Sequence, residues 1–551
     1  AVMAGNQGEL NLDLGNGGYL EGRVDDYQDA AIQNVNESHG NGFYNPEFSK
    51  EITDRGEINL TMGDKAYWNV TGQSWVSSLT TTGDSAVIDM VGEDNITHAL
   101  TIENMQGNAN FKMCLNGNEK VNSDMLYMKY VQGSYNIYLD RMVTDSEIGE
   151  NGLRFATVGD GSSAEFKVFA SDKGFFDKEY TVGSEDYVKG DSANSDYNGD
   201  SLDDRKPGKE AVDNYFDGTY TKAIATLADN TGDLLQNDTN FKLIGSSSEI
   251  SDGGETILNM SRANYSNAVY MDRLNKRLGE ARYIDGDEGI WMRLRHDRIG
   301  KQDDFRSMNT MYEIGYDRKA DVDNGQRRIG IAGDYMQGST EYTGVSGSGD
   351  IKRIGLWAYD TWLGDKGHYA DYVVKWGHLS NDFNLFRNEK ISGDYSNDVF
   401  SVSAEYGKKN DIGGDWYFEP QAQLQYAYVT DAHYSSSQGT EVDVDSIHSL
   451  IARGGFRIGK DFGSEKKSTV YFKADIMHEF LGDQDIAVRD SSTDGSWTAV
   501  GYGNEGTWFD VGFGFAAQTG DNSYVYLDLE QSFGNDNEDT YQINAGMQWS
   551  F

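Results

Sequence analysis

Apolar and polar residues alternate with a period of two over the last third of the chain, most clearly in its final segments. In the segment 507–517, Phe509, Phe513 and Phe515 occupy one set of alternate positions, whereas Asp510 and glycines occupy the other. A period of two places the two sets on opposite faces of a β-strand. An apolar face opposite a polar, glycine-rich face is typical of a transmembrane β-barrel strand.

About twelve such segments fill the region from residue 288 to the C-terminus. Loops rich in Gly, Asp, Asn and Ser separate them, which predicts antiparallel neighbours. The predicted strands are 288–297, 308–318, 326–336, 351–362, 368–380, 393–408, 414–430, 444–460, 468–481, 507–519, 523–533 and 540–551.

The number of strands indicates which face points outward, because alternation alone is also found in soluble barrels. Side chains can fill an eight-stranded barrel, but they cannot fill one of about twelve strands. The polar set is therefore expected to line a wet or plugged lumen, and the apolar set to face lipid. The predicted fold class is all-β, with an antiparallel transmembrane barrel; a soluble β-sandwich is the alternative.

Residues 1–248 contain short alternating runs between glycine-containing turns, for example around Leu12, Leu60 and Ile102. These runs recur irregularly, about every 20 residues, which suits the rungs of a right-handed parallel β-helix. An ordinary β-sandwich is the alternative for this region. Length and pattern together predict a β-helical segment 1–248, a linker 249–259, a helix 260–283 and a barrel 286–551.

The segment 260–283 contains no proline and no glycine before Gly279, so we predict one continuous α-helix. Its length of about 30 Å matches the height of a membrane-embedded barrel. We expect it to lie in the lumen, held by partly desolvated ion pairs, with a solvent-exposed surface helix as the alternative. The helix cations are Arg262, Arg273, Lys276, Arg277 and Arg282, and the predicted lumenal acids are Glu419, Asp475, Asp510, Asp528 and Glu530.

Composition restricts the possible partners and gives no sign of catalysis. Lys and Arg total 47 against 90 Asp and Glu, a net charge of −43, which argues against nucleic acid because phosphates would not be neutralised. No HExxH motif or nucleotide-binding glycine loop is present, and Ser85 and Ser201 stand in only partial hydrolase motifs. We therefore predict neither an enzyme nor a cofactor. The acidic loop 196–204 is a weak candidate for Ca²⁺, because its oxygen spacing matches a calcium loop only in part.

The single cysteine, Cys114, excludes an internal disulfide, which suits a chain that crosses a membrane unfolded. The first residues lack the charged start and apolar core of a signal peptide. Because an outer-membrane barrel needs export, we expect an export signal that has been removed or lies upstream. The segment 8–14 resembles the middle of a β-helix rung, so further passenger sequence upstream is also an expectation.

Four stretches carry a resemblance to the monomeric type V autotransporters. Leu274–Glu280 resembles the linker helix of the serine-protease autotransporters, and Glu419–Tyr426 resembles one of their barrel strands. Asn544–Phe551 resembles the terminal signal read by the outer-membrane assembly machinery, which implies roles for Tyr541, Gly546, Trp549 and Phe551. Trp68–Gly72 is similar to the pertactin-like end of a passenger, the autochaperone, here about 56–195.

The resemblance also exposes a departure at the position of a family cleavage site. In the serine-protease relatives, an Asn-Asn pair just before the linker run cyclises and cuts the chain inside the barrel. Asp272 and Arg273 stand at these positions, and Asn cyclisation needs the amide side chain. We therefore predict that the passenger stays joined to the barrel; an Asp-dependent or external cut is the alternative.

The resemblance implies an outer-membrane protein that secretes and displays its own passenger, which is expected to be an adhesin or surface stalk. The implied partners are outer-membrane lipid, the barrel assembly machinery, periplasmic chaperones and ligands on host or neighbouring cells. A porin-like channel with an extracellular cap is one alternative. Another is the translocator remnant of an enzyme-bearing autotransporter whose catalytic part lies upstream.

Overall fold

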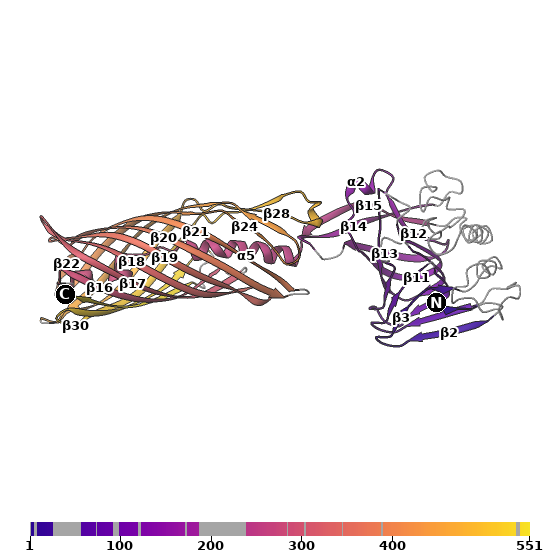
Figure 1. Ribbon diagram of the computed structural model, residues 1–551, viewed down its shortest axis with the longest axis horizontal. Coiled ribbons are helices and arrows are strands. Elements are labelled where there is room, and N and C mark those ends of the chain that lie inside the picture. Colours follow the sequence, from indigo (N-terminus) through magenta and orange to yellow (C-terminus); the bar gives the residue numbers. More distant parts are fainter. Residues whose placement is uncertain are drawn as a thin grey trace, which may run out of the picture. The chain divides into compact units, whose positions relative to one another are not determined.

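The computed structural model divides the chain into two compact units, Ala1–Glu249 and Ile250–Phe551 (Figure 1). It describes all residues except 1, 5–7, 26–56, 73, 92–97, 119–122, 171–173, 187–238, 284, 302–304, 344, 387–389, 465 and 536–539. The candidate Ca²⁺ loop 196–204 and Ser201 lie outside the described residues, as does the end of the predicted autochaperone.

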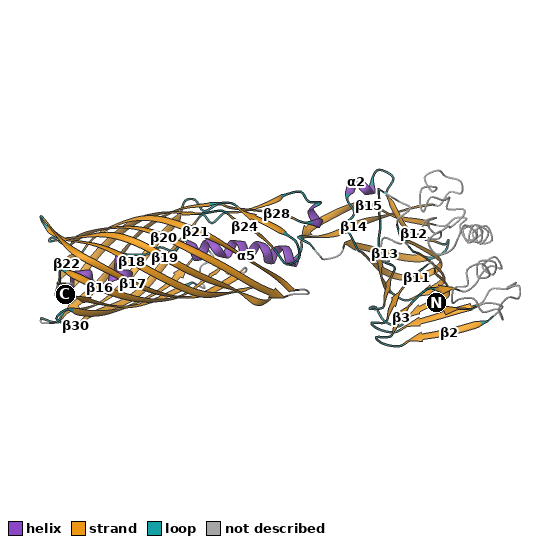
Figure 2. Cartoon of the chain, viewed as in Figure 1, coloured by secondary structure: helices purple, strands orange, loops and turns teal. Residues whose placement is uncertain are grey.

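Strands dominate the first unit (Figure 2). They are β1 (Val2–Met3), β2 (Glu9–Leu14), β3 (Tyr19–Glu21), β4 (Val24–Asp25), β5 (Glu57–Met62), β6 (Tyr67–Asn69), β7 (Ser74–Thr81), β8 (Val87–Asp89), β9 (Ala99–Gln106), β10 (Ala109–Met113), β11 (Met125–Leu139), β12 (Leu153–Val158), β13 (Ser163–Ala170), β14 (Phe176–Asp186) and β15 (Thr239–Ile250). A single turn of helix, α2 (Asp145–Ile148), begins at a capping box formed by Thr144 and Glu147.

Two series of these strands pair in parallel, each strand with the corresponding strand one repeat later. One series is β2, β5, β7, β9, β11 and β12, and the other is β3, β6, β8, β10, β11 and β13. Alternate residues point inward, so that Trp68, Ile88 and Phe111 stack in the buried core. Parallel stacking at this spacing is what the repeat predicted; the right-handed β-helix itself stays a prediction.

Antiparallel pairing appears at the end of this unit. β13 pairs with β14 and β12 pairs with β15, both antiparallel. Phe166 packs against Phe155 and Phe241, with ring centroids 5.4 and 4.8 Å apart, so the last strands share the core of the parallel region.

The second unit is a closed antiparallel barrel of 12 strands (Figure 1). The strands are β16 (Glu288–Lys301), β17 (Phe305–Val322), β18 (Gly325–Tyr342), β19 (Ser346–Gly364), β20 (His368–Phe386), β21 (Lys390–Lys408), β23 (Trp416–Val429), β26 (Ile447–Phe462), β27 (Ser468–Glu479), β30 (Gly506–Gly520), β31 (Ser523–Phe533) and β32 (Tyr541–Ser550). The last strand pairs with the first through Gly289↔Ser550 to Arg298↔Tyr541, which closes the barrel. A short strand, β22 (Asn410–Gly413), pairs with β23 beside β21.

The predicted strands and their two faces are confirmed, although most strands extend several residues beyond the predicted limits. Ile331, Leu356 and Phe513 are among the exposed outward-facing residues, whereas Asp317, Asp371 and Asp528 are buried in the lumen. Within the described residues, no helix is long and apolar enough to cross a membrane.

The two ends of the barrel differ in their connections. At one end the strands are joined by tight turns, such as residues 323–324 and 521–522. The other end, the long-loop end, has the two longest connections, 430–446 and 480–505, together with 534–540 and three connections of three residues each. The two longest form a small sheet of β24 (Ala432–Ser435), β25 (Glu441–Val444), β28 (Gln484–Arg489) and β29 (Thr498–Tyr502), with the 3-10 turn η8 (Ser491–Thr493). Short periplasmic turns and long extracellular loops are typical of outer-membrane barrels.

The predicted continuous helix 260–283 is wrong in extent and continuity. The structure has α5 (Asp252–Ala268), an extended break at 269–273, α6 (Leu274–Leu278) and a 3-10 turn, η7 (Ala281–Tyr283). Residues 252–259, predicted as linker, are helical because Ser251 caps the first turn, accepting a hydrogen bond from the Gly254 amide. The whole segment lies inside the barrel (Figure 1).

Candidate functional site in the barrel lumen

Helix α5 enters the lumen from the long-loop end, and hydrogen bonds from several strands hold it. Ser261 contacts both Tyr434 of β24 and Gln484 of β28 at that end. Farther in, the Tyr265 hydroxyl donates to Glu479 at 2.6 Å, and Asn267 bonds Asn309 at 2.8 Å. These partners are buried, so each bond replaces hydration that the lumenal side chains lose when the helix is present.

The break at 269–273 is held open by barrel side chains that bond its backbone. Gln425 donates to the Tyr270 carbonyl at 3.3 Å, and Gln423 donates to the Asp272 carbonyl at 2.7 Å. Glu405 accepts from the Leu274 amide at 2.9 Å. These groups satisfy backbone atoms that a helix would have paired internally, which makes an extended segment tolerable inside the barrel.

Tyr270 and Asp272 occupy the break and contact cations of the barrel wall. The Tyr270 ring centroid lies 3.9 Å from the Arg295 guanidinium and 4.8 Å from that of Arg353. The Asp272 carboxylate accepts from Arg293 at 2.8 Å and from Lys375 at 3.1 Å. The lumenal segment therefore supplies an acid to the wall as well as cations.

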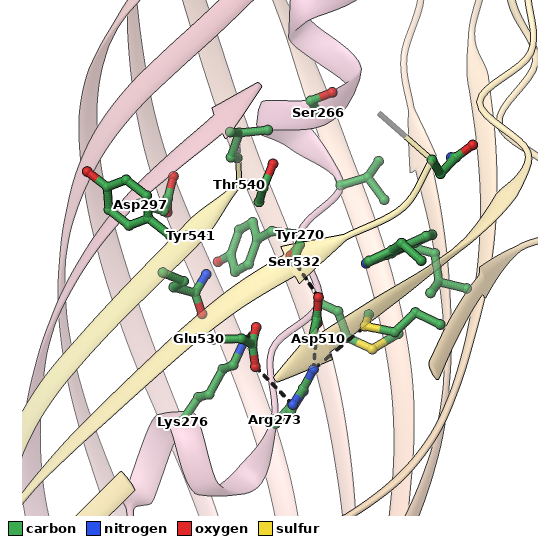
Figure 3. Close-up of a pocket in the computed structure, with 18 of the residues that line it drawn as sticks. Ser266, Tyr270, Arg273, Lys276, Asp297, Asp510, Glu530, Ser532, Thr540 and Tyr541 are labelled. Atoms are coloured by element: carbon green, nitrogen blue, oxygen red, sulfur yellow. Dashed lines mark hydrogen bonds and ion pairs between the residues drawn. The ribbon is translucent and has the colours of Figure 1, made fainter. Parts of the chain in front are cut away.

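Arg273 and Lys276 form a charge cluster with acids of the barrel wall (Figure 3). Arg273 lies 2.6 Å from Asp475, 3.0 Å from Asp510 and 3.1 Å from Glu530. Lys276 contacts Glu530 at 2.6 Å. All of these side chains are buried, so attraction between them is weakly screened and depends on complete pairing.

The short helix α6 and the following turn are held at the tight-turn end. Arg277 contacts Asp371 at 2.6 Å and lies over the Tyr359 ring, while the Tyr526 hydroxyl donates to the Arg277 carbonyl. Beyond it, Arg282 contacts Glu419 at 3.1 Å and Glu280 at 2.9 Å. The segment is thus bonded along its length to strands on all sides of the barrel.

Within the described part of the chain, two of the predicted residues do not form the predicted ion pairs between the helix and the barrel wall. Asp528 is buried in the lumen but contacts Lys473 of the neighbouring strand β27 at 2.6 Å, rather than a helix cation. Arg262 is half-buried, and its guanidinium carbon lies 4.0 Å from the ring centroid of Tyr502 in β29. This contact is at the long-loop end, away from the other charge contacts. The other four helix cations contact Glu419, Asp475, Asp510 and Glu530, together with the unpredicted Asp371.

The expectation of a simply acidic lumen is incomplete, because the wall also carries buried cations. Those cations are Arg293, Arg295, Arg328, Arg353, Lys375, Arg453, Arg457 and Lys473. They stand at the alternate, inward positions of their strands, so the period of two could have revealed them. The helical segment supplies Asp272 and Glu280 as acidic partners for these cations. Asp272 contacts Arg293, and Glu280 contacts Arg457 at 2.9 Å.

A cavity of about 150 Å³ lies beside the break, between the helical segment and strands β16, β30, β31 and β32. Figure 3 shows Arg273, Lys276, Asp510 and Glu530 at one end of it and Thr540 and Tyr541 at another. Both terminal nitrogens of Arg295 have no hydrogen-bond partner among the described residues. The cavity has an apolar side and a charged side, and a volume of this size beside charged groups has room for water molecules that can satisfy them.

The residues of the predicted terminal signal lie on the strand that closes the barrel. Trp549 and Phe551 are exposed on the outer face, and Tyr541 is half-buried beside the Arg298 guanidinium. Gly546 lies under the Tyr526 ring of β31, where an added Cβ would lie 2.2 Å from ring atoms. A side chain at this position would displace the tyrosine that bonds the lumenal segment.

Removal of a single buried charge is expected to destabilise the folded barrel strongly. Asp371→Asn leaves the fully buried Arg277 guanidinium without its ionic partner, at a cost of about 3–5 kcal/mol. Asp360→Asn is the matched control, because its partner Arg327 lies on the exposed outer surface, where such a pair contributes about 0–1 kcal/mol. Urea unfolding of the detergent-folded protein measures both. Equal midpoints for the two variants would contradict the buried network.

Comparison with known proteins shows what the barrel is similar to. Residues 288–530 match the family model described as the autotransporter beta-domain. The chain is 25% identical over 505 residues to the serine protease Pet autotransporter of Escherichia coli O44:H18, covering 90% of this chain and 34% of that protein. It is 26% identical over 290 residues to the pertactin autotransporter of Bordetella parapertussis, covering 50% of this chain and 30% of that protein.

Among solved structures, the β domain of the Bordetella autotransporter BrkA is similar, with a TM-score of 0.40 and 23% sequence identity. The alignment covers 48% of the present chain and 100% of the BrkA β domain. The present chain spans about a third of the length of the two curated relatives, at 34% and 30%.

Proposed function

We propose that this chain is an outer-membrane autotransporter, with its β-domain at residues 288–530, and that it displays its own N-terminal unit on the cell surface. The barrel is the translocator, and the unit Ala1–Glu249 belongs to the passenger. The activity and the partners of the whole protein also belong to this proposal. The proposed partners are outer-membrane lipid, the barrel assembly machinery and periplasmic chaperones.

One observation carries the proposal: the direction in which the lumenal segment is threaded. Strand β15 ends at Ile250, and α5 begins at Asp252 at the long-loop end of the barrel. The segment then continues to the tight-turn end, where η7 lies and β16 begins. Long loops mark the extracellular side of outer-membrane barrels, so the chain before α5 leaves the barrel outside the cell.

A displayed stalk with an adhesive role fits the first unit better than an enzyme does. Some relatives are named serine proteases, but these activities belong to those proteins. In the described part of the chain, Ser85 lies in a turn, where it bonds Asp64 and accepts from the Lys65 amide. These contacts are those of a turn residue. We propose that the displayed first unit has a binding function instead of a catalytic one.

A porin-like channel is the less favoured candidate. The lumenal segment contacts strands on all sides of the barrel, and the cavity beside it has a volume of about 150 Å³. A channel would need an aqueous path through the wall-to-wall contacts of Arg273, Arg277 and Arg282.

We also propose that the passenger stays joined to its barrel. The Asp272 side chain is buried, and both of its carboxylate oxygens accept from cations of the wall, Arg293 and Lys375. A carboxylate held in this way cannot act as the nucleophile that an amide provides in Asn cyclisation.

The chain is expected to remain intact in the outer membrane. When residues 1–551 are expressed behind a cleavable export signal, denaturing mass spectrometry should give 61.3 kDa. Protease added to intact cells should remove the first unit and leave the barrel with its lumenal segment, since that segment is buried. A pair of fragments split near residue 272 before protease treatment would overturn the joined passenger. A first unit protected on intact cells would overturn surface display.

A further inference from the structure

The outer face of one parallel strand series carries aromatic rings and polar groups in two straight rows. The first row is Tyr19, Tyr67, Val87, Asn110, Asn136 and Lys167; the second is Glu21, Asn69, Asp89, Lys112, Tyr138 and Phe169. Each of these residues is at least partly exposed, because the residues between them point into the core. We call this surface the ladder face.

Two aromatic platforms lie at opposite ends of the ladder face. Tyr19 stacks on Tyr67 with 5.9 Å between ring centroids, and Tyr138 stacks on Phe169 with 5.8 Å. Tyr19 is 60% exposed and Tyr138 is 41% exposed. Large aromatic rings are usually buried when they serve the core, whereas exposed rings that combine an apolar body with a hydroxyl are typical of binding surfaces.

Hydrogen-bonding groups fill the space between the platforms. Asn136 donates to Asn110 at 3.0 Å, and Lys112 contacts Asp89 at 3.4 Å. Asn110 also donates to the Asp84 and Ala86 carbonyls. Asp89 also accepts from the Tyr67 hydroxyl, and these contacts fix the groups in place. The Asn136 amide and the Lys112 ammonium have further hydrogen-bonding capacity for a ligand. Five spacings between neighbouring strands make the two rows roughly 24 Å long, at about 4.8 Å per strand.

Charge separates this face from the rest of the molecule. The ladder face has two acids, Glu21 and Asp89, and two cations, Lys112 and Lys167, whereas the whole chain has a net charge of −43. The formally neutral face does not attract polyions, and the surrounding acidic chain repels polyanions at long range. A flat row of rings and amides on a neutral surface therefore suits an uncharged polyhydroxylated chain, whose ring faces stack and whose hydroxyls bond amides.

We propose that the ladder face binds a neutral glycan chain, lying along the rows with sugar rings stacked on the two aromatic platforms. This inference rests on the proposed surface display and names the class of ligand. Acidic glycans and a second copy of this chain are the other conceivable occupants, and they are outcomes of the test.

The test measures binding of the detergent-solubilised full chain to immobilised neutral oligosaccharides, with heparin as the polyanionic probe. Tyr138→Ala and Tyr19→Ala should each weaken binding to the neutral glycan by about tenfold, because each removes an exposed anchor. Tyr130→Ala is the matched control: Tyr130 is 53% exposed on the same strand β11 but lies off the ladder face. Its affinity should equal that of the unmodified chain.

The proposal is overturned if no neutral glycan binds, if heparin binds instead, or if Tyr130→Ala weakens binding as much as the other two variants. Self-association that is lost in Tyr138→Ala without glycan binding would assign the face to a second copy, and would also overturn it. Protease accessibility of the first unit on intact cells is measured in parallel. Normal display without glycan binding refutes only the ligand class, whereas absent display refutes the proposed function itself.

Discussion

Deletion of the lumenal segment is expected to convert a closed barrel into an open, cation-selective pore. The comparison uses two proteins, residues 250–551 and residues 284–551, both folded into planar bilayers. The shorter protein should conduct on the order of ten times more current, because a twelve-stranded barrel without its plug encloses an aqueous lumen.

Cation selectivity follows from the charges of the wall that the deletion leaves. The deletion removes Asp272 and Glu280 together with the lumenal cations, and among the described residues the wall that remains has 12 buried acids against 8 buried Lys and Arg. Reversal potentials in a salt gradient measure the selectivity. As a control, Asp360→Asn changes only a half-exposed residue of the outer surface and should leave both conductance and selectivity unchanged. Equal conductance for the two proteins would mean that the lumenal segment does not close the barrel.

Deletion of residues 56–159 is expected to impair display of the remaining passenger while leaving barrel assembly intact. These residues contribute most of the parallel strands and the core around Trp68, Ile88 and Phe111. Folding of this core outside the cell is proposed to make backward sliding unfavourable, which gives secretion a direction without ATP. Heat-modifiable migration reports barrel assembly, and protease accessibility on intact cells reports display.

A pair of point variants separates loss of the core from loss of chain length. Phe111→Asp places an unpaired carboxylate in the fully buried core, whereas Lys112→Asp places the same group one residue later on the exposed face. Phe111→Asp should reduce display several-fold, and Lys112→Asp should not. Equal display of both variants, or normal display after the deletion, would refute a folding-driven step.

The barrel could be predicted from the sequence because its two environments are so different. Lipid outside and a polar lumen inside impose a period of two on every strand, and Phe513 and Asp528 follow it as expected. The parallel pairing of the first unit was foreseeable for a similar reason, since its repeats bury Trp68, Ile88 and Phe111 at corresponding positions. The charge excess of the helix also indicated a lumenal position before any contact was known.

The break in the helix could not be foreseen, because nothing in its local sequence requires it. Residues 269–273 contain neither glycine nor proline. The segment is extended because Gln423, Gln425 and Glu405, each more than a hundred residues away, bond its backbone groups. Propensity describes an isolated segment, and tertiary hydrogen bonds override it here.

The individual ion pairs could not be predicted from the sequence either. Asp528 and Glu530 belong to the same face of β31, and both contact Lys473 of the wall. Only Glu530 also contacts Lys276 of the lumenal segment. Strand register and the depth of the helix decide such choices, and both depend on the closed barrel as a whole. The sequence by itself therefore determined which residues face lipid, lumen and core, because periodicity follows from local backbone geometry. Only the tertiary structure decided which lumenal charges meet, because those contacts join residues up to about 250 positions apart.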